Sequence, residues 1–197
     1  MAITPLNVCM GPANLYWGPY GSVEPAHTTA ALTSVPDSTV WTDVGAIADG
    51  TAVLLEVDQT YTEIGAEQTI DAIGARLTKR TIQVTASLEE TTLANMTLAM
   101  NQLASTDVET GYSVLLPLTG SAQSQPVYTA LIIDGWAPTA GTTETSCRRR
   151  IVIRKCLSNS KVDIEYEKSK PSLFATVWTA YYVSGSIAPF EVTDQTS

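Results

Sequence analysis

The sequence predicts a mainly β protein: a β-sandwich or open β-barrel with one flanking α-helix, a long loop and an extended N-terminal arm. Two stretches, 54–62 and 79–89, alternate between apolar and polar residues, as strands with one buried side and one solvent-facing side do. Charged residues make up only 16% of the chain, and much of the remainder is Thr and Ser, which favours sheets. The length of 197 residues fits one domain spanning 1–197.

Glycine and proline interrupt the chain between residues 11 and 40. Gly11-Pro12 and Gly18-Pro19 argue against a long helix or an unbroken central strand there, so we expect an extended arm. Trp17 and Tyr20 make this segment too apolar for a free tail. The arm is therefore expected to be pinned to a surface by packing.

The two alternating stretches predict paired strands whose polar sides face water. Leu55, Val57, Ile82 and Val84 would face the core. The intervening loop, 63–78, is long for a compact hairpin and is expected to be functional or disordered. The opposite, polar side comprises Glu56, Asp58, Thr60 and Thr62 with Thr81, Gln83, Thr85, Ser87 and Glu89.

A helix is predicted over 90–104. Ser87 and Glu90 have capping-box spacing, and an apolar stripe of Leu93, Met96, Met100 and Leu103 should pack on a sheet. Residues 190–197 are expected to form a disordered end or a docking segment. Further strands are predicted at Trp41–Val44, Tyr112–Leu118, Val127–Ile133, Arg148–Leu157, Val162–Glu167 and Phe174–Val183.

No combination of residues predicts catalysis, so the chain is not expected to be an enzyme or to hold a cofactor or metal. His27 is the only histidine, which leaves a zinc site short of ligands. The cysteines, Cys9, Cys147 and Cys156, are too few and too scattered for a disulfide framework. Cys147 and Cys156 are expected to be small apolar fillers on or beside one strand.

Charge is distributed unevenly along the chain. The first 75 residues contain nine acids and no Lys or Arg, and the net charge is −9. Such a field repels polyanions, although a solubility requirement would explain it equally well. A basic block follows at Arg148, Arg149, Arg150, Arg154 and Lys155, but alternation divides it between two strand faces. Its arginines are expected to meet carboxylates, within the subunit or across a subunit boundary, rather than nucleic acid.

Several short motifs occur in an order that resembles a known family. Gly21-Ser22-Val23-Glu24-Pro25 precedes Trp41-Thr42-Asp43-Val44-Gly45 and Asp49-Gly50, and a strand, a long loop, a second strand and a helix follow. This order resembles the major tail proteins, or tail tube proteins, of long-tailed bacteriophages. The likeness covers residues 11–104 well and the later strands only in outline.

The resemblance implies a subunit of the virion tail, made in the bacterial cytoplasm, that forms hexameric rings stacked into a hollow tube. Its partners would be other copies of itself and the tape-measure, terminator and distal tail proteins, with DNA as passing cargo and no membrane. The polar strand faces would line the lumen, where the acids of residues 56 and 58 would keep DNA from adsorbing. Contacts between subunits or rings would involve Glu63, Glu67, Asp71, Arg76, Arg148, Arg150 and Arg154.

Two other functions fit the same pattern. One is a carbohydrate- or receptor-binding β-sandwich, in which Trp136, Trp178, Tyr181 and Tyr182 would form a stacking platform. Strand alternation sends Tyr181 away from Trp178 and Tyr182, so at least part of this set is expected in the core. The other is a capsid decoration or tail-terminator ring, which shares the sandwich and the ring.

Overall fold

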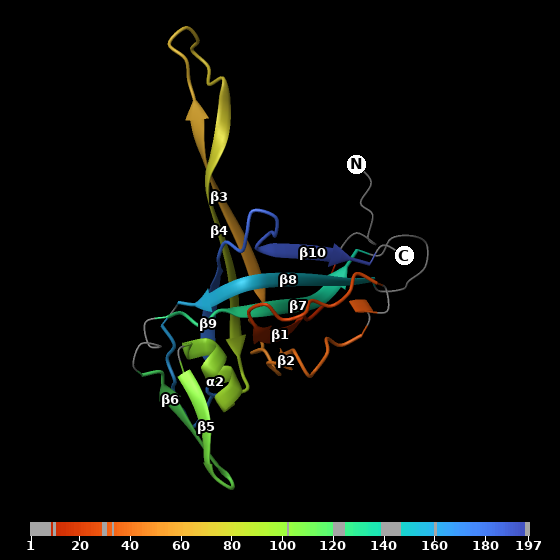
Figure 1. Cartoon of the computed structure of the whole chain (residues 1–197), viewed down its shortest axis with the longest axis vertical. Helices are drawn as coiled ribbons and strands as arrows, with labels where there is room; N and C mark the ends of the chain where they lie inside the picture. The colour runs from red at the N-terminus through yellow and green to blue at the C-terminus, as the bar shows by residue number, and fades with distance from the viewer. Residues whose placement is uncertain are drawn as a thin grey trace.

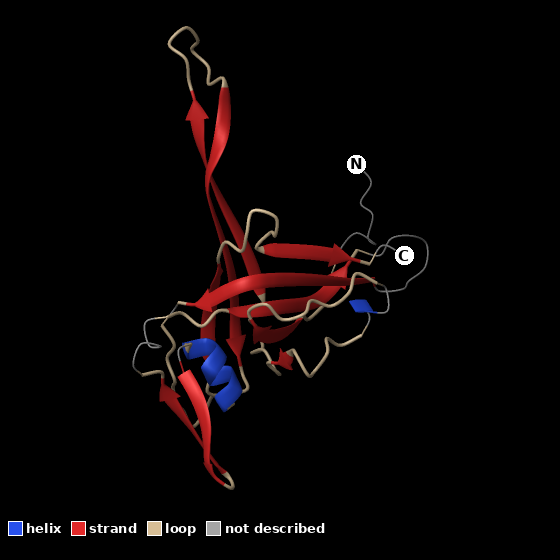
Figure 2. Cartoon of the chain, in the orientation of Figure 1, coloured by secondary structure: helices blue, strands red, loops and turns tan. Residues whose placement is uncertain are grey.

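The protein is mainly β, with an open antiparallel sheet of eight strands, a separate two-stranded sheet and the helix α2 (Figure 2). The structure is a computed structural model that describes Cys9 and residues 11–28, 31–32, 34–101, 103–119, 125–138, 147–159 and 161–195. The main sheet has the order β2-β1-β7-β8-β9-β4-β3, with β10 also paired to β8, and it does not close into a barrel. Its strands are β1 (Asn14–Pro19), β2 (Thr42–Asp43), β3 (Leu54–Ile64), β4 (Gly74–Leu88), β7 (Thr129–Ala137), β8 (Cys147–Ser158), β9 (Phe174–Ala180) and β10 (Phe190–Asp194).

Strands β7 and β8 lie in the middle of the sheet, with apolar side chains on both faces. On one face, Leu131 and Ile153 belong to the main core, which also contains Trp178 of β9. On the other face, Ile132 and Val152 form a second cluster. Burial on both sides is why these strands lack a clean polar alternation.

The N-terminal arm is shorter than predicted. The part before Tyr20 is not an arm, because Asn14–Pro19 forms β1, which pairs with both β2 and β7. Gly18-Pro19 lies at the end of this strand, so it does not interrupt the pairing. Beyond β1, Trp41 packs in the second cluster with Ile132 and Val152. Pinning by packing is confirmed at this end of the arm.

A two-stranded extension of β3 and β4 projects far beyond the rest of the molecule (Figure 1). The prediction of a loop over 63–78 is wrong, because pairing continues to Ile64 and Gly74 and leaves only residues 65–73 as the tip. Thr60 pairs with Lys79 and Tyr61 with Leu77, so Thr78 is a one-residue bulge. We call the projecting part, residues 54–82, the ribbon.

Helix α2 (Leu93–Met100) is shorter than predicted and begins at a different cap. Thr92 is the N-cap, and its side chain accepts a hydrogen bond from the Asn95 backbone. The predicted capping box does not form, because Ser87 lies in β4 and the Glu90 carboxylate instead accepts from the backbone N–H of Ala46. The helix ends at Asn101, which has a positive φ of 56°.

The buried side of α2 also differs from the predicted stripe. Leu98 and Ala99 are buried, whereas Leu93 and Met100 are exposed. Asn95 is buried between helix and loop, and its Nδ2 donates to the carbonyls of Val44 and Glu90 at 2.8 Å each. The segment after Trp41 is thus tied to the helix through backbone carbonyls, which hydrophobic periodicity cannot reveal.

The later strands agree with the predictions in part. Residues 162–167 do not form the predicted strand. Residues 190–194 form β10, which pairs with β8 of the same chain, rather than a disordered end. Cys147 and Cys156 are buried on β8 as expected, and burial raises the pKa of the Cys156 thiol to about 12. The sequence did not indicate β5 (Leu103–Glu109), which pairs with β6 (Tyr112–Pro117) beside α2.

Candidate assembly surface

The ribbon has two strands and two free edges. Strand β4 pairs with β9 only from Gln83 to Leu88, so residues 74–82 have no second neighbour among the described strands. Along the whole of β3, no described strand pairs with its outer edge. Isolated two-stranded sheets are marginally stable, and free edges are templates for pairing with another chain. The ribbon is therefore a candidate for pairing with another chain.

The register of the ribbon confirms the predicted alternation, but Val57, which was predicted to face the core, is exposed. Glu56 lies opposite Gln83 and Asp58 opposite Thr81, on the face away from the buried residues Ile82 and Val84. This polar face is exposed or half-buried in the single chain. The placement of this polar face along a lumen stays a prediction. The remaining residues predicted for this face are Thr60, Thr62, Thr85 and Ser87, with Glu89 exposed just beyond β4.

The polar face is not purely acidic, which corrects the expectation of an acidic wall. Lys79 lies opposite Thr60, and the bulge brings Arg76 opposite Thr62. Both bases therefore share a face with Glu56 and Asp58. Without the bulge, sequence parity would place Arg76 on the other side.

The charges of the ribbon and its tip have no partner within the described part of the chain. Neither an ion pair nor a side-chain hydrogen bond forms at any of them. All of these residues are exposed. They include four of the residues predicted for contacts between subunits. The full set is Glu56, Asp58, Glu63, Glu67, Asp71, Arg76, Lys79 and Arg80.

The basic block on β8 behaves in the opposite way, because each of its bases has an intrachain partner. Arg148 lies over the ring of Trp136 at 4.3 Å, and Lys155 lies over the ring of Tyr128 at 4.3 Å. Arg149 forms a bidentate ion pair with Asp194, with both hydrogen bonds at 2.7 Å, and thereby lowers the pKa of that carboxyl group. Such a block offers little to a phosphate backbone.

Arg150 is the most buried of these bases. Its side chain is 3% exposed and pairs with Asp134 at 2.7 Å beneath the arm. It also donates to the carbonyls of Ala31 and Ser34. The predicted role of Arg150 between subunits is therefore wrong, since its side chain is buried within the subunit and out of reach of a neighbour.

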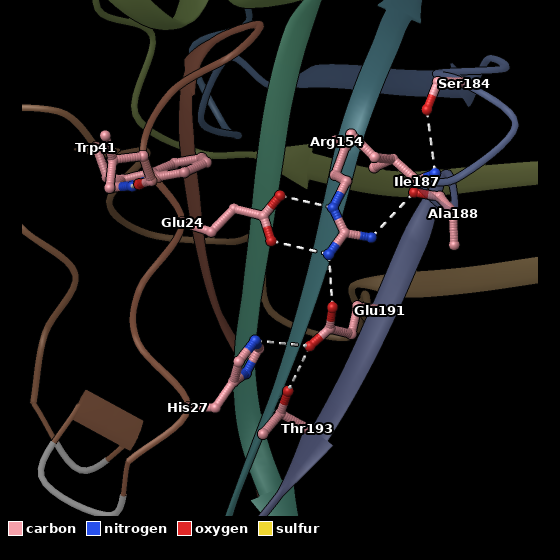
Figure 3. Close-up of polar contacts among 10 residues, drawn as sticks. Glu24, His27, Trp41, Arg154, Ser184, Ile187, Ala188, Glu191 and Thr193 are labelled. Carbon is pink, nitrogen blue, oxygen red and sulfur yellow. Dashed lines mark hydrogen bonds and ion pairs between the residues drawn. The ribbon is translucent and has the colours of Figure 1, made fainter.

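Arg154 holds the arm to the sheet (Figure 3). Its guanidinium donates to both carboxylate oxygens of Glu24 in the arm, at 2.6 and 2.9 Å, and also to Glu191 of β10. His27 lies 3.2 Å from the other oxygen of Glu191. The hydrogen bond from Arg154 is the main cause that lowers the pKa of Glu191. Arg154 thus acts within the subunit, and its predicted role between subunits stays a prediction. We call Arg154, Glu24, Glu191 and His27 the arm latch.

The four aromatic residues of the predicted sugar platform do not form one surface. Trp178 is fully buried, so it cannot stack on a ligand. Arg148 covers the ring of Trp136. Tyr181 packs edge-on against Tyr128, and of the four only Tyr182 is largely exposed, at 72%. No described feature favours the sugar-binding function.

The described residues contain no cluster of ligands for a metal ion. A hollow of about 260 Å³ lies beside the arm latch, lined in part by Trp41 and Val152. Its charged residues, Glu24 and Arg154, are paired with each other. None of the described helices has the length and apolar character to cross a bilayer.

Comparisons with protein-family models and with curated protein sequences gave no match to this chain.

Proposed function

We propose that the protein is a self-assembling structural subunit whose ribbon pairs edge to edge with the ribbons of neighbouring copies. The observation that carries the proposal is the exposed two-stranded ribbon with both edges unpaired. Pairing on both sides would satisfy the free backbone groups and extend the sheet from copy to copy. The body of the subunit, whose arginines are already paired, would serve as the rigid support.

Within that class, we propose a tail tube subunit of a long-tailed bacteriophage. Hexameric rings would stack into a tube, and the polar face of the ribbon would line a water-filled bore through which DNA passes. The polar alternation and the motif order from Trp41 to α2 support this proposal. Wide barrels do enclose aqueous channels. The tape-measure, terminator and distal tail partners, and the location in the virion, belong to the same proposal.

Negative-stain electron microscopy of the purified full chain tests it. We expect rings or tubes with a central opening. Dispersed particles at every protein concentration would contradict the proposal, and sugar-dependent binding by such particles would support the sandwich-module alternative instead. Rings that never stack would favour a terminator or decoration ring.

A further inference from the structure

The charges of the ribbon are segregated by strand. Strand β3 carries acids at Glu56, Asp58 and Glu63, whereas the free-edged part of β4 carries only bases. Those bases are Arg76, Lys79 and Arg80. The ribbon therefore has an acidic edge and a basic edge, and neither set of charges is neutralised within the described chain.

Two identical ribbons can meet at their edges in three ways. Pairing of β3 with β3, or of β4 with β4, places equivalent edges together about a two-fold axis. The first brings acids against acids and the second brings bases against bases, and like charges on facing strands are destabilising. Both two-fold arrangements are therefore disfavoured.

The third arrangement pairs β3 of one copy with β4 of the next. Because β3 and β4 are antiparallel within the hairpin, ribbons side by side in the same orientation also meet as antiparallel strands. On one face, an offset of four residues along the strands would place Glu56 beside Lys79 and Asp58 beside Arg76 of the neighbour. On the other face, Glu63 and Arg80 also lie on opposite edges, although the same offset does not bring them together.

We infer that this charge segregation selects β3-to-β4 pairing between copies, and therefore a head-to-tail arrangement rather than two-fold dimers. The inference rests on the proposed edge-to-edge assembly and adds which edge meets which. A contact between two different edges repeats from copy to copy, and it closes into a ring when the rotation permits. Like-charge contacts then act against the wrong assemblies.

Pairing within one hairpin is the competing use of the same charges. Asp58 lies opposite Thr81, and Lys79 lies opposite Thr60, so Asp58 and Lys79 are diagonal neighbours. The carboxylate of Asp58 and the ammonium group of Lys79 nevertheless form no ion pair in the described chain. An experiment must therefore separate charges that act between copies from charges that act within one.

Two full-length variants provide that separation. The first, Glu56→Lys with Asp58→Lys, makes the main charged face of the ribbon basic. The second, Arg76→Glu with Lys79→Glu, makes the same face acidic. We expect each variant alone to remain folded but to lose the ring peak in analytical ultracentrifugation. An equimolar mixture should form rings again, with the two variants alternating.

The outcomes are decisive in both directions. Recovery of rings in the mixture supports charge selection between copies, since repulsion within each hairpin would persist after mixing. Assembly of either variant alone at the wild-type level, or failure of the mixture, overturns the inference. A charge-neutral control outside the ribbon, Glu165→Lys with Lys168→Glu at exposed positions, should assemble like wild type. Wild-type protein run in parallel tests the proposed function itself, which fails if that protein forms no rings.

Discussion

The charged side chains of the ribbon and of β8 differ in whether they have partners within the chain. On β8, Arg149, Arg150 and Arg154 each meet a carboxylate of the same chain. On the ribbon, Arg76 and Lys79 meet no carboxylate among the residues that the structure describes. The charged side chains of the body hold one subunit together, whereas those of the ribbon are available to a neighbour.

The difference separates folding from assembly. Substitutions in the body should change the stability of the subunit, because they break interactions that exist in the single chain. Substitutions in the ribbon should change only the association of copies, because in the single chain those side chains are surrounded by water. The five predictions below test this separation.

Removing the outer ribbon should have the largest effect. Replacing residues 61–78 with Asn-Gly would connect the facing residues Thr60 and Lys79 by a two-residue hairpin turn. We expect a folded subunit that forms no rings or tubes, as judged by circular dichroism and electron microscopy. Tubes of normal appearance from this variant would contradict the assignment of assembly to the ribbon.

Arg150→Ala should have the next largest effect, on stability alone. It leaves the buried Asp134 carboxylate without its cation, and breaking a buried pair costs about 3–5 kcal/mol. The matched control in the ribbon, Arg80→Ala, should change the free energy of unfolding by less than about 0.5 kcal/mol. Urea denaturation measures both.

A double substitution sharpens the Arg150 prediction. Nε of Arg150 and Oδ1 of Asp134 are buried without a hydrogen-bond partner in the described chain. Because the pair is incompletely satisfied, Arg150→Met with Asp134→Leu should be less destabilising than Arg150→Ala. A double variant that is less stable than the single one would show that the ion pair itself stabilises the body.

Salt should affect the two regions differently, though less strongly than the substitutions. At 1 M salt the Debye length falls to about 3 Å, which screens exposed charges at the ribbon edges. We expect the ring fraction to decrease while the urea midpoint of the unassembled subunit changes little. A ring fraction that increases with salt would indicate that apolar contacts, rather than charges, dominate assembly.

The smallest effect should be a pH dependence of the arm latch. Arg154 lowers the pKa of Glu191 below its ordinary value of 4.5, so the folded state favours the carboxylate. The contribution to stability is complete above the ordinary pKa and is lost as the pH falls through the lowered one. The stability difference between wild type and Arg154→Met should thus disappear in acid, and at neutral pH it should not exceed about 1 kcal/mol for such partly exposed groups. A difference that stays constant with pH would exclude this role.

The strands that border the core could be predicted from sequence because they alternate. Ile82 and Val84 face the core while Thr81 and Gln83 do not, so their period is visible without a structure. The outer ribbon could not be predicted in this way. Both faces of the part predicted as a loop are exposed, so no burial imposes a pattern on residues such as Ala75.

The residues that pair with the arginines could also not be identified from the sequence. Fork-shaped side chains on a strand indicated carboxylate partners, which is confirmed for Arg149, Arg150 and Arg154. Glu24, however, lies far from Arg154 along the chain, and only the path of the arm brings them together. Local patterns therefore gave the type of partner but not its location.

The bulge at Thr78 makes the charge pattern of the ribbon depend on residue count as well as residue type. If Thr78 paired with Tyr61 instead of bulging, Arg76 would lie opposite Glu63 on the face of Arg80, and Lys79 would be the only one of the three bases on the face of Glu56 and Asp58. Lengthening both strands by two residues preserves which charges share a face, whereas one residue added to a single strand exchanges them beyond that point unless a bulge absorbs it. Variation in the length of this hairpin is thus restricted to even steps, or to single residues that a bulge absorbs, wherever the faces must match those of another copy.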